Sequence, residues 1–381
     1  MTSLHSVRQG RHRATWAAGT AALILAVTGA VAACSAPAQR PESSPGAPAA
    51  VAPPALHAGP PVLAAAFTVP GGGLVNEVQL SPDGTLAAAA STSAAGTSKI
   101  YVWDVATRKY RITLDAPGGS VYLAFGPGDT TLTGLVQQAG SGNAAIDRWN
   151  LATGERTTLW NPPGDANWIV SYNDTVLAIA NAADDAIAVL SVGTGHAIAD
   201  ISMPGGANIV DYGLELDSDG RTLIASDQHG NSYIWNVATG ALVARLRYPA
   251  ADVVKGVLQH PLFLSPDGKT VVIPDAQGPS TLQDVATGAN LTPRDAMWPA
   301  DNGGCLFSTD SRVCATAQGA HTINLWDVGT GTFLTAVSNP ALVGLEGIPA
   351  IGPAAGEVVT LAPYAKGGAS TLYLWKIPSR R

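Results

Sequence analysis

The fold is decided by residues 80 to 107, which begin Leu-Ser-Pro-Asp-Gly-Thr-Leu and end Ile-Tyr-Val-Trp-Asp-Val-Ala-Thr. Ser81 to Gly84 predicts a tight turn, because proline presets φ, aspartate can bond nearby backbone and glycine tolerates positive φ. Ile100 to Trp103 alternates β-branched and aromatic residues, which suits a pleated strand. The stretch therefore predicts three strands joined by two turns.

The Trp-Asp end of this stretch recurs along the chain. Its counterparts are Trp149-Asn150, Leu190-Ser191, Trp235-Asn236, Gln283-Asp284, Trp326-Asp327 and Trp375-Lys376, at successive spacings of 46, 41, 45, 48, 43 and 49 residues. An Ala-Thr-Gly or Gly-Thr-Gly turn follows five of the seven, whereas the first copy reads Ala106-Thr107-Arg108. Seven units of four short strands at this period are typical of an all-β, seven-bladed β-propeller.

On these motifs the chain resembles the WD-repeat β-propellers over roughly residues 62 to 378. The resemblance implies a ring of four-stranded blades that serves mainly as an interaction platform. The Gly-His dipeptide that opens the family's repeats is not found at the start of these units. The expected blades span 73 to 116, 119 to 160, 166 to 203, 207 to 247, 252 to 293, 297 to 337 and 341 to 378.

The N-terminal end of the repeat region has one extra predicted strand, and the C-terminal end lacks one. Leu63 to Val69 predicts an isolated strand, and the last unit stops at Trp375 to Pro378, where a fourth strand would follow. We therefore expect the N-terminal strand to close the last blade, which would remove an open sheet edge. The apolar residues that end the innermost strands, and the strand-end tryptophans, are expected between neighbouring blades.

Residues 1 to 33 predict a signal peptide, with Arg8, Arg11 and Arg13 before an apolar run that ends in small residues. Val31 to Cys34 is similar to a bacterial lipobox, in which the cysteine receives a lipid and becomes the new N-terminus. A plain secretory signal or an uncleaved anchor helix remains the alternative.

Residues 34 to 61 are rich in proline and alanine and predict a disordered linker, with a proline-rich partner ligand as the alternative. The propeller is expected over 62 to 381.

Charge argues against nucleic acid as a partner. The chain has 21 basic and 28 acidic residues, and removal of three arginines with the signal would leave a net charge of −10. Phosphate binding needs clustered lysine and arginine.

We expect a monomer, anchored to the extracytoplasmic face of the cell membrane through lipid on Cys34.

Cys305 and Cys314 flank the predicted turn at Ser308 to Ser311, on adjacent antiparallel strands. If Phe307 pairs with Cys314, the two cysteines are diagonal and their Cα separation is marginal for a disulfide. An oxidising compartment favours the bond. Two buried free thiols are the alternative.

Catalytic and metal-binding motifs are sparse. The seven histidines show no metal-ligand spacing, and the sequence contains no nucleophile elbow, phosphate loop or dinucleotide fingerprint in a suitable context. The polar turns Asp184-Asp185 and Asp227-x-His229-x-Asn231 are interpreted as solvated loops, with a metal or acid/base site as the alternative. We expect no metal, no cofactor and no catalytic residue.

A candidate binding face follows from comparing the units. Two connections in each unit are nearly uniform, whereas the other two vary and should all emerge on one face of the ring. Aromatic and charged residues on such loops suit a binding surface. The candidates are Trp160, Trp168, Tyr248, Lys255, Arg294, Asp295, Trp298, Asp301, Tyr364 and Lys366. Several of them, Trp168 above all, could instead begin strands and fill the ring.

Three functions are therefore open. The first is a non-catalytic platform that binds a protein or another large ligand. The second is a propeller enzyme of the lactonase or glycan-cleaving type, with its site at the mouth of the ring; it would need polar and acidic residues near the axis. The third is a structural spacer in a cell-envelope complex.

Overall fold

A computed structural model describes residues 55–379 apart from 71–72, 94, 119, 138–143, 162–167, 173–174, 182–184, 193, 248–252, 255–256, 259–261, 274–279, 293–304, 319–320, 340–349 and 363–369. The predicted signal peptide, Cys34 and most of the predicted linker lie outside these residues. Within the described part, no helix is long and apolar enough to cross a membrane.

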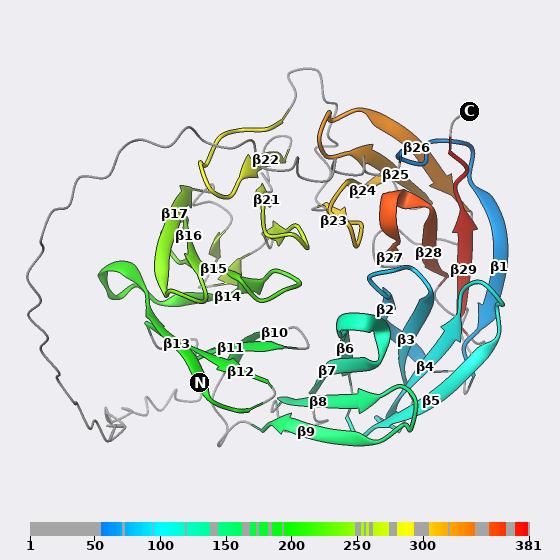
Figure 1. The fold of residues 1–381 in the computed structure, drawn as a ribbon, viewed down its shortest axis with the longest axis horizontal. Coiled ribbons are helices and arrows are strands. Elements are labelled where there is room, and N and C mark those ends of the chain that lie inside the picture. Colours follow the sequence, from blue (N-terminus) through cyan, green and yellow to red (C-terminus); the bar gives the residue numbers. More distant parts are fainter. Residues whose placement is uncertain are drawn as a thin grey trace, which may run out of the picture. The chain divides into compact units, whose positions relative to one another are not determined.

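Seven antiparallel sheets stand around a common axis as the blades of a β-propeller, which confirms the predicted fold (Figure 1). Blades one and two contain β2 (Leu74–Leu80), β3 (Leu86–Thr92), β4 (Ser98–Asp104) and β5 (Tyr110–Ala116), then β6 (Ser120–Phe125), β7 (Thr131–Gln137), β8 (Ala144–Asn150) and β9 (Arg156–Trp160). Blades three and four contain β10 (Trp168–Tyr172), β11 (Val176–Asn181), β12 (Ala186–Ser191) and β13 (Ala197–Ser202), then β14 (Ile209–Leu216), β15 (Thr222–Asp227), β16 (Asn231–Asn236) and β17 (Ala241–Arg247).

The remaining blades have shorter innermost strands. Blade five contains β20 (Phe263–Leu264), β21 (Thr270–Ile273) and β22 (Thr281–Asp284), with a single bridge from Gln283 to Asn290 at the fourth position. Blades six and seven contain β23 (Leu306–Phe307), β24 (Val313–Gln318), β25 (Thr322–Asp327) and β26 (Phe333–Ser338), then β27 (Ala350–Ile351), β28 (Glu357–Ala362) and β29 (Thr371–Lys376). Three short 3-10 turns are η1 (Pro127–Asp129), η2 (Pro204–Gly206) and η5 (Pro353–Ala355).

The N-terminal strand closes the ring as predicted. β1 (Val62–Thr68) is the outermost strand of blade seven and pairs antiparallel with β29, from Val62 opposite Lys376 to Thr68 opposite Thr371 (Figure 1). Residues before β1 extend this contact, because the amide of Gly59 donates to the carbonyl of Pro378 at 2.8 Å. Chain segments from both ends of the propeller therefore complete one sheet.

In blades one, five and six, the first turn is held by a serine and an aspartate. In blade one, the Ser81 hydroxyl donates to Asp83 at 2.8 Å and accepts from the amide of Leu86 at 2.9 Å. The same pair of contacts recurs at Ser265 with Asp267 and at Ser308 with Asp310. The Ser-Pro-Asp-Gly pattern thus recurs because its side chains replace backbone partners within the turn.

In five units, the aspartate or asparagine that ends the third strand holds the second uniform turn. Asp104 accepts from both the amide and the hydroxyl of Thr107 at 2.7 Å. Asn150, Asn236, Asp284 and Asp327 likewise accept from the amide of the threonine three residues later. An acceptor at this position and a threonine three residues later therefore form a repeated unit of local structure.

The core is divided among the junctions between blades. Seven clusters of buried apolar residues occupy the seven junctions, and each draws on both neighbouring blades. The tryptophans expected there are buried: Trp103, Trp149, Trp235, Trp326 and Trp375 are all at most 9% exposed. Trp149 also crosses a junction, since its indole N–H donates to the carbonyl of Asp115 in blade one at 3.0 Å.

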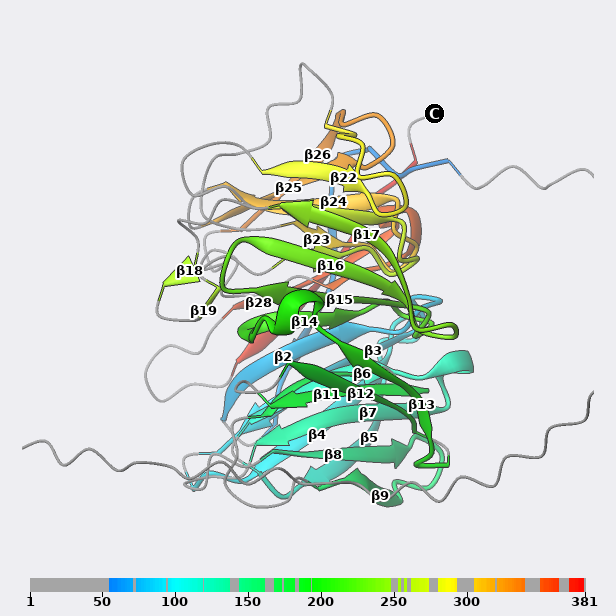
Figure 2. The same cartoon turned by 90° about the vertical axis from the view of Figure 1, so that its left-hand side faces the viewer.

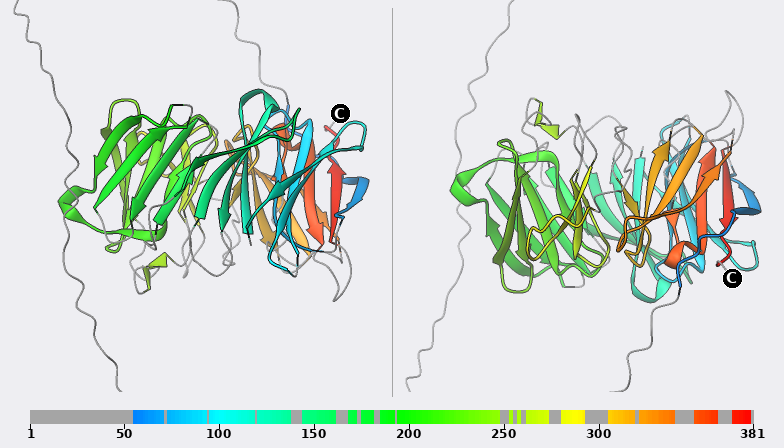
Figure 3. Two further views of the ribbon diagram at one scale, coloured as in Figure 1. Left: turned by 90° about the horizontal axis from the view of Figure 1, so that it is seen from below. Right: turned by 90° about the horizontal axis from the view of Figure 1, so that it is seen from above.

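Two predictions of strand position need correction. The sequence predicts that the innermost strands end at Leu80, Phe125, Val170, Leu216, Leu264, Phe307 and Ile351. Six of them do, but β10 of blade three continues past Val170 to Tyr172. Blade five does not begin near 252: β18 (Val253–Val254) and β19 (Val257–Leu258) instead form a small hairpin that joins β14 of blade four through Asp211 and Val257. This hairpin projects from one face of the ring (Figure 2 and Figure 3). A short valine-rich hairpin cannot be distinguished from an innermost strand by periodicity.

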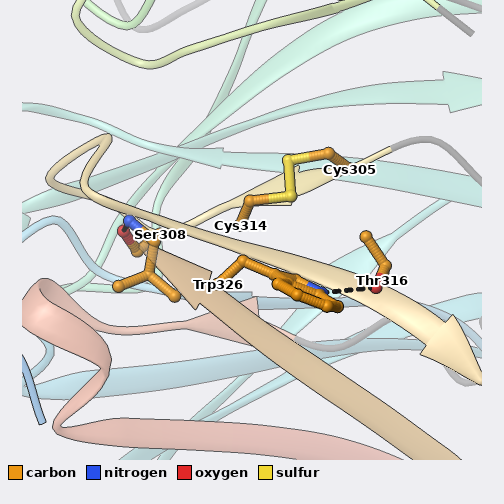
Figure 4. Close-up of a disulfide and its surroundings, with 6 residues drawn as sticks. Cys305, Ser308, Cys314, Thr316 and Trp326 are labelled. Carbon is orange, nitrogen blue, oxygen red and sulfur yellow. Dashed lines mark hydrogen bonds between the residues drawn. A yellow bond between two sulfur atoms is a disulfide. The ribbon is translucent and has the colours of Figure 1, made fainter. Parts of the chain in front are cut away.

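A disulfide joins Cys305 and Cys314 inside the junction of blades five and six (Figure 4). Phe307 does pair with Cys314, the register that makes the cysteines diagonal. Their Cα atoms nevertheless lie 5.5 Å apart, within the range for a disulfide. Cys305 precedes the two-residue strand β23, so its backbone is outside the ladder and can approach its partner.

Candidate functional site

The candidate site is a polar cavity at the junction of blades three and four. Its volume is about 600 Å³. It is lined by three segments: η2 with the two residues that follow it, the turn between β15 and β16, and the last residues of β17. The strands of a blade alternate in direction, so these segments all lie at the end of the ring that carries the variable connections. Because β17 is the outermost strand, the cavity lies toward the rim and away from the axis.

Asp227 organises the inner wall of the cavity. Its carboxylate accepts from the amides of His229 and Asn231 at 2.8 and 3.0 Å, and from the Asn231 side chain at 2.8 Å. The Tyr233 hydroxyl also donates to it at 3.2 Å. Asp227 is only 1% exposed. This carboxylate therefore builds the turn that carries His229 toward solvent.

The charge state of Asp227 follows from these contacts. Burial by itself would raise the pKa of Asp227, but the hydrogen bonds from Asn231, His229 and Tyr233 outweigh it and lower the pKa below its ordinary value. Burial and the negative charge of Asp227 in turn raise the pKa of Tyr233. Asp227 is therefore ionised at neutral pH, and Tyr233 remains a hydrogen-bond donor.

Two arginines of β17 form the outer wall. Arg245 donates to the Asn231 side-chain oxygen at 2.8 Å, and its guanidinium lies 5.3 Å from the centre of the Tyr233 ring. Arg247 pairs with Asn231 across the ladder and is exposed. The asparagine thus links the buried aspartate to an arginine that faces the cavity. The amide side chains of Asn208 and Gln228 are exposed at the cavity entrance.

Most of the residues predicted for the binding face are not described. Tyr248, Lys255, Arg294, Asp295, Trp298, Asp301, Tyr364 and Lys366 lie outside the described residues. Trp160 is half-buried and packs against the cluster between blades two and three. Trp168 is the first residue of β10, paired with Asn181. The described structure therefore does not join any of the predicted candidates to the cavity.

The cavity was missed because its parts are ordinary turns in the sequence. The sequence predicts a solvated loop at Asp227, His229 and Asn231. His229 is exposed, but Asp227 and Asn231 are buried. A signal was nevertheless present, since Arg245 and Arg247 alternate on a strand at the edge of the same unit. Alternate residues of a strand lie on one face, so these two cations share a face. They lie beside the polar turn that precedes the neighbouring strand, and together these groups indicate a charged surface.

Four other carboxyls have raised pKa values, one of which is Asp217 in the turn after β14, where burial is the main cause. Burial raises the pKa of Glu77 in β2 to about 7 and of Glu215 in β14 to about 8. Glu77 accepts from Gln79, and Glu215 accepts from the amide of Leu264 at 2.8 Å in the neighbouring blade. Burial and the adjacent Asp83 raise the pKa of Asp129 in η1 to about 7. These carboxyls lie in blades one, two and four and have separate partners, so they do not form one acid/base set.

Within the described part of the chain, no three histidine, cysteine, aspartate or glutamate side chains come together in a way that could hold a metal ion. No protein-family model matches the chain, and no curated protein matches it.

Proposed function

We propose that the protein is a lipid-anchored lipoprotein of the WD-repeat type, on the extracytoplasmic face of the cell membrane, whose propeller binds a protein partner without catalysing a reaction. The observation that carries the proposal is the open, charged cavity between blades three and four. It lies on a ring whose last blade contains both ends of the propeller, so the surface around it is held by a closed scaffold. Rigid scaffolds with variable connections commonly carry binding sites.

The sequence supports the anchor. The basic and apolar residues before Cys34 have the pattern of an exported lipoprotein, and the proline-rich residues after it would keep the propeller away from the bilayer. The disulfide between Cys305 and Cys314 agrees with export, because such bonds persist mainly in oxidising compartments.

Site-specific crosslinking of the full chain in cells tests the platform. A photo-crosslinking residue replaces Gln228 at the cavity, and in a matched control it replaces Ala106, which is exposed on a uniform turn of the opposite end. A protein captured at position 228 and not at 106 would support the proposal. Capture that is equal at both positions, or none at either, would contradict it, and a screen for hydrolase or lyase activity would then follow.

A Cys34→Ala variant tests the anchor separately. We expect the variant to be lost from the membrane fraction. We also expect it to lose or weaken the crosslinking pattern of the native chain. A variant that stays in the membrane fraction after its signal peptide has been removed would rule out lipid on Cys34 as the anchor.

A further inference from the structure

The cavity differs in charge from the chain as a whole. The protein has seven more acidic than basic residues, yet the charged side chains that line the cavity are two arginines and one ionised aspartate. The charges of these three side chains sum to one net positive charge. A local excess of the opposite sign directs an anionic group to this place and not to the rest of the surface.

The side chains of Arg245 and Arg247 differ in the contacts that they make. Arg245 is held by the Asn231 side chain and by the face of Tyr233, so little side-chain freedom remains to be lost on binding. Arg247 lies two residues farther along β17 and is exposed. Alternate residues of a strand point to the same side, so the two guanidinium groups can face one ligand.

The chemistry of the cavity favours a single carboxylate. A guanidinium group forms paired hydrogen bonds with a carboxylate, and one net positive charge matches one carboxylate better than a doubly charged phosphate. A sugar would need an open aromatic face, whereas Tyr233 is 4% exposed and lies beneath Arg245. Asn208 and Gln228 provide amide groups at the entrance, which suit the backbone of a peptide.

We infer that this cavity binds a peptide segment of the partner through one carboxylate, with Arg247 as its direct ion partner and Arg245 as the pre-oriented second donor. The inference rests on the proposed function, because it assumes that the partner is a protein. The carboxylate can belong to a glutamate or aspartate side chain, or to the C-terminus of the segment.

An array of random-sequence decapeptides, probed with the labelled full chain in detergent, tests the inference. Each peptide is made with glutamate, glutamine, lysine or phosphoserine at one central position, and each with a free or an amidated C-terminus. We expect stronger binding to the glutamate or free-terminus peptides than to their neutral counterparts. Arg247→Gln should weaken that binding about tenfold, the usual effect of losing one charge-assisted hydrogen bond.

Two further variants separate loss of the contact from loss of folding. Arg247→Glu should reverse the preference toward the lysine peptides, a gain that a misfolded protein would not show. Arg111→Gln, at an exposed arginine on β5, should retain the preference of the native chain. These results together would support the inference.

Other outcomes would overturn it. A preference for phosphoserine that depends on Arg247 would assign a different ligand class. A carboxylate preference unchanged in Arg247→Gln, or no preference at all, would show that the cavity does not recognise this group. If the array shows no carboxylate preference while crosslinking at position 228 still captures a protein, the proposed binding platform is supported and only the carboxylate inference is contradicted.

Discussion

Phe67 lies against Trp103 with ring centroids 5.6 Å apart, although the two residues belong to different blades. Phe67 is on β1, the closing strand of blade seven, and Trp103 is on β4 of blade one. The N-terminal strand therefore does more than complete a sheet, because it also fills the junction with the next blade.

Truncation of this side chain should weaken the whole ring. Phe67 is 6% exposed, and replacing a buried phenylalanine with alanine costs about 3–5 kcal/mol. Phe67→Ala should lower the free energy of unfolding by that amount in urea denaturation. Leu63→Ala on the same strand is the matched control, since Leu63 is 48% exposed and should change stability by less than about 0.5 kcal/mol. Equal losses in the two variants would contradict a specific role for the junction.

Arg108 occupies a position where five other units have glycine. Its φ is 62°, and the corresponding Gly154 and Gly331 have φ of 76° and 64°. Holding a residue with a side chain in this left-handed conformation costs about 1–2 kcal/mol, a cost that glycine avoids. Part of that advantage is offset because glycine loses more backbone entropy on folding. Arg108→Gly should therefore stabilise the protein by about 0.5–1 kcal/mol. Thermal unfolding would check this, with Arg111→Gly in the adjacent strand as a control that should destabilise.

The disulfide should be a major support of the junction between blades five and six. Only five residues of the described chain form the buried cluster there, and closing a loop of this size contributes about 2–3 kcal/mol. Cys314→Ser, or reduction of the native chain, should lower the midpoint of thermal unfolding. Thiol titration of denatured, unreduced Cys34→Ala protein should detect no free thiol. Two thiols per chain would show that the bond does not form.

Asp129 should make stability depend on pH. Its pKa is raised from 3.8 to about 7 by burial and by Asp83 in blade one, so the folded state holds this proton more tightly than the unfolded state. The stabilising contribution is complete below about pH 4 and is lost as the pH rises to about 7. The pKa of Asp83 is lowered by its hydrogen bonds to Asp129, Thr85 and Ser81 despite burial, so its own contribution is lost only in stronger acid.

Asp129→Asn should retain a donor to Asp83 without the cost of ionisation. Relative to the native chain it should gain stability between about pH 5 and about pH 8, with the largest gain at the alkaline end. Urea denaturation at intervals across this range would measure the difference. Asp200→Asn, at an exposed residue of β13, is the charge-matched control. A pH dependence that is the same in both variants would contradict the assignment to Asp129.

Local sequence determined the ring and its closure. Ser81 and Asp83 form their turn through contacts within six residues, and Asp104 binds Thr107 three residues away. Such contacts need no other blade, so each unit could be located from its own residues. The fourth strand of blade seven could also be inferred, because an unpaired sheet edge left only one segment to complete it.

Only the tertiary structure decided where polar groups meet. The cavity brings together η2, the Asp227 turn and Arg245 of β17. The strand pattern places the turn and Arg245 side by side in one blade, but nothing in the sequence indicates that η2 lies near them. The Cys305 contact similarly depends on where the short ladder of β23 stops. Strand patterns repeat because the hydrogen bonds that form them are local, whereas the distance between loops of different blades depends on how the blades pack.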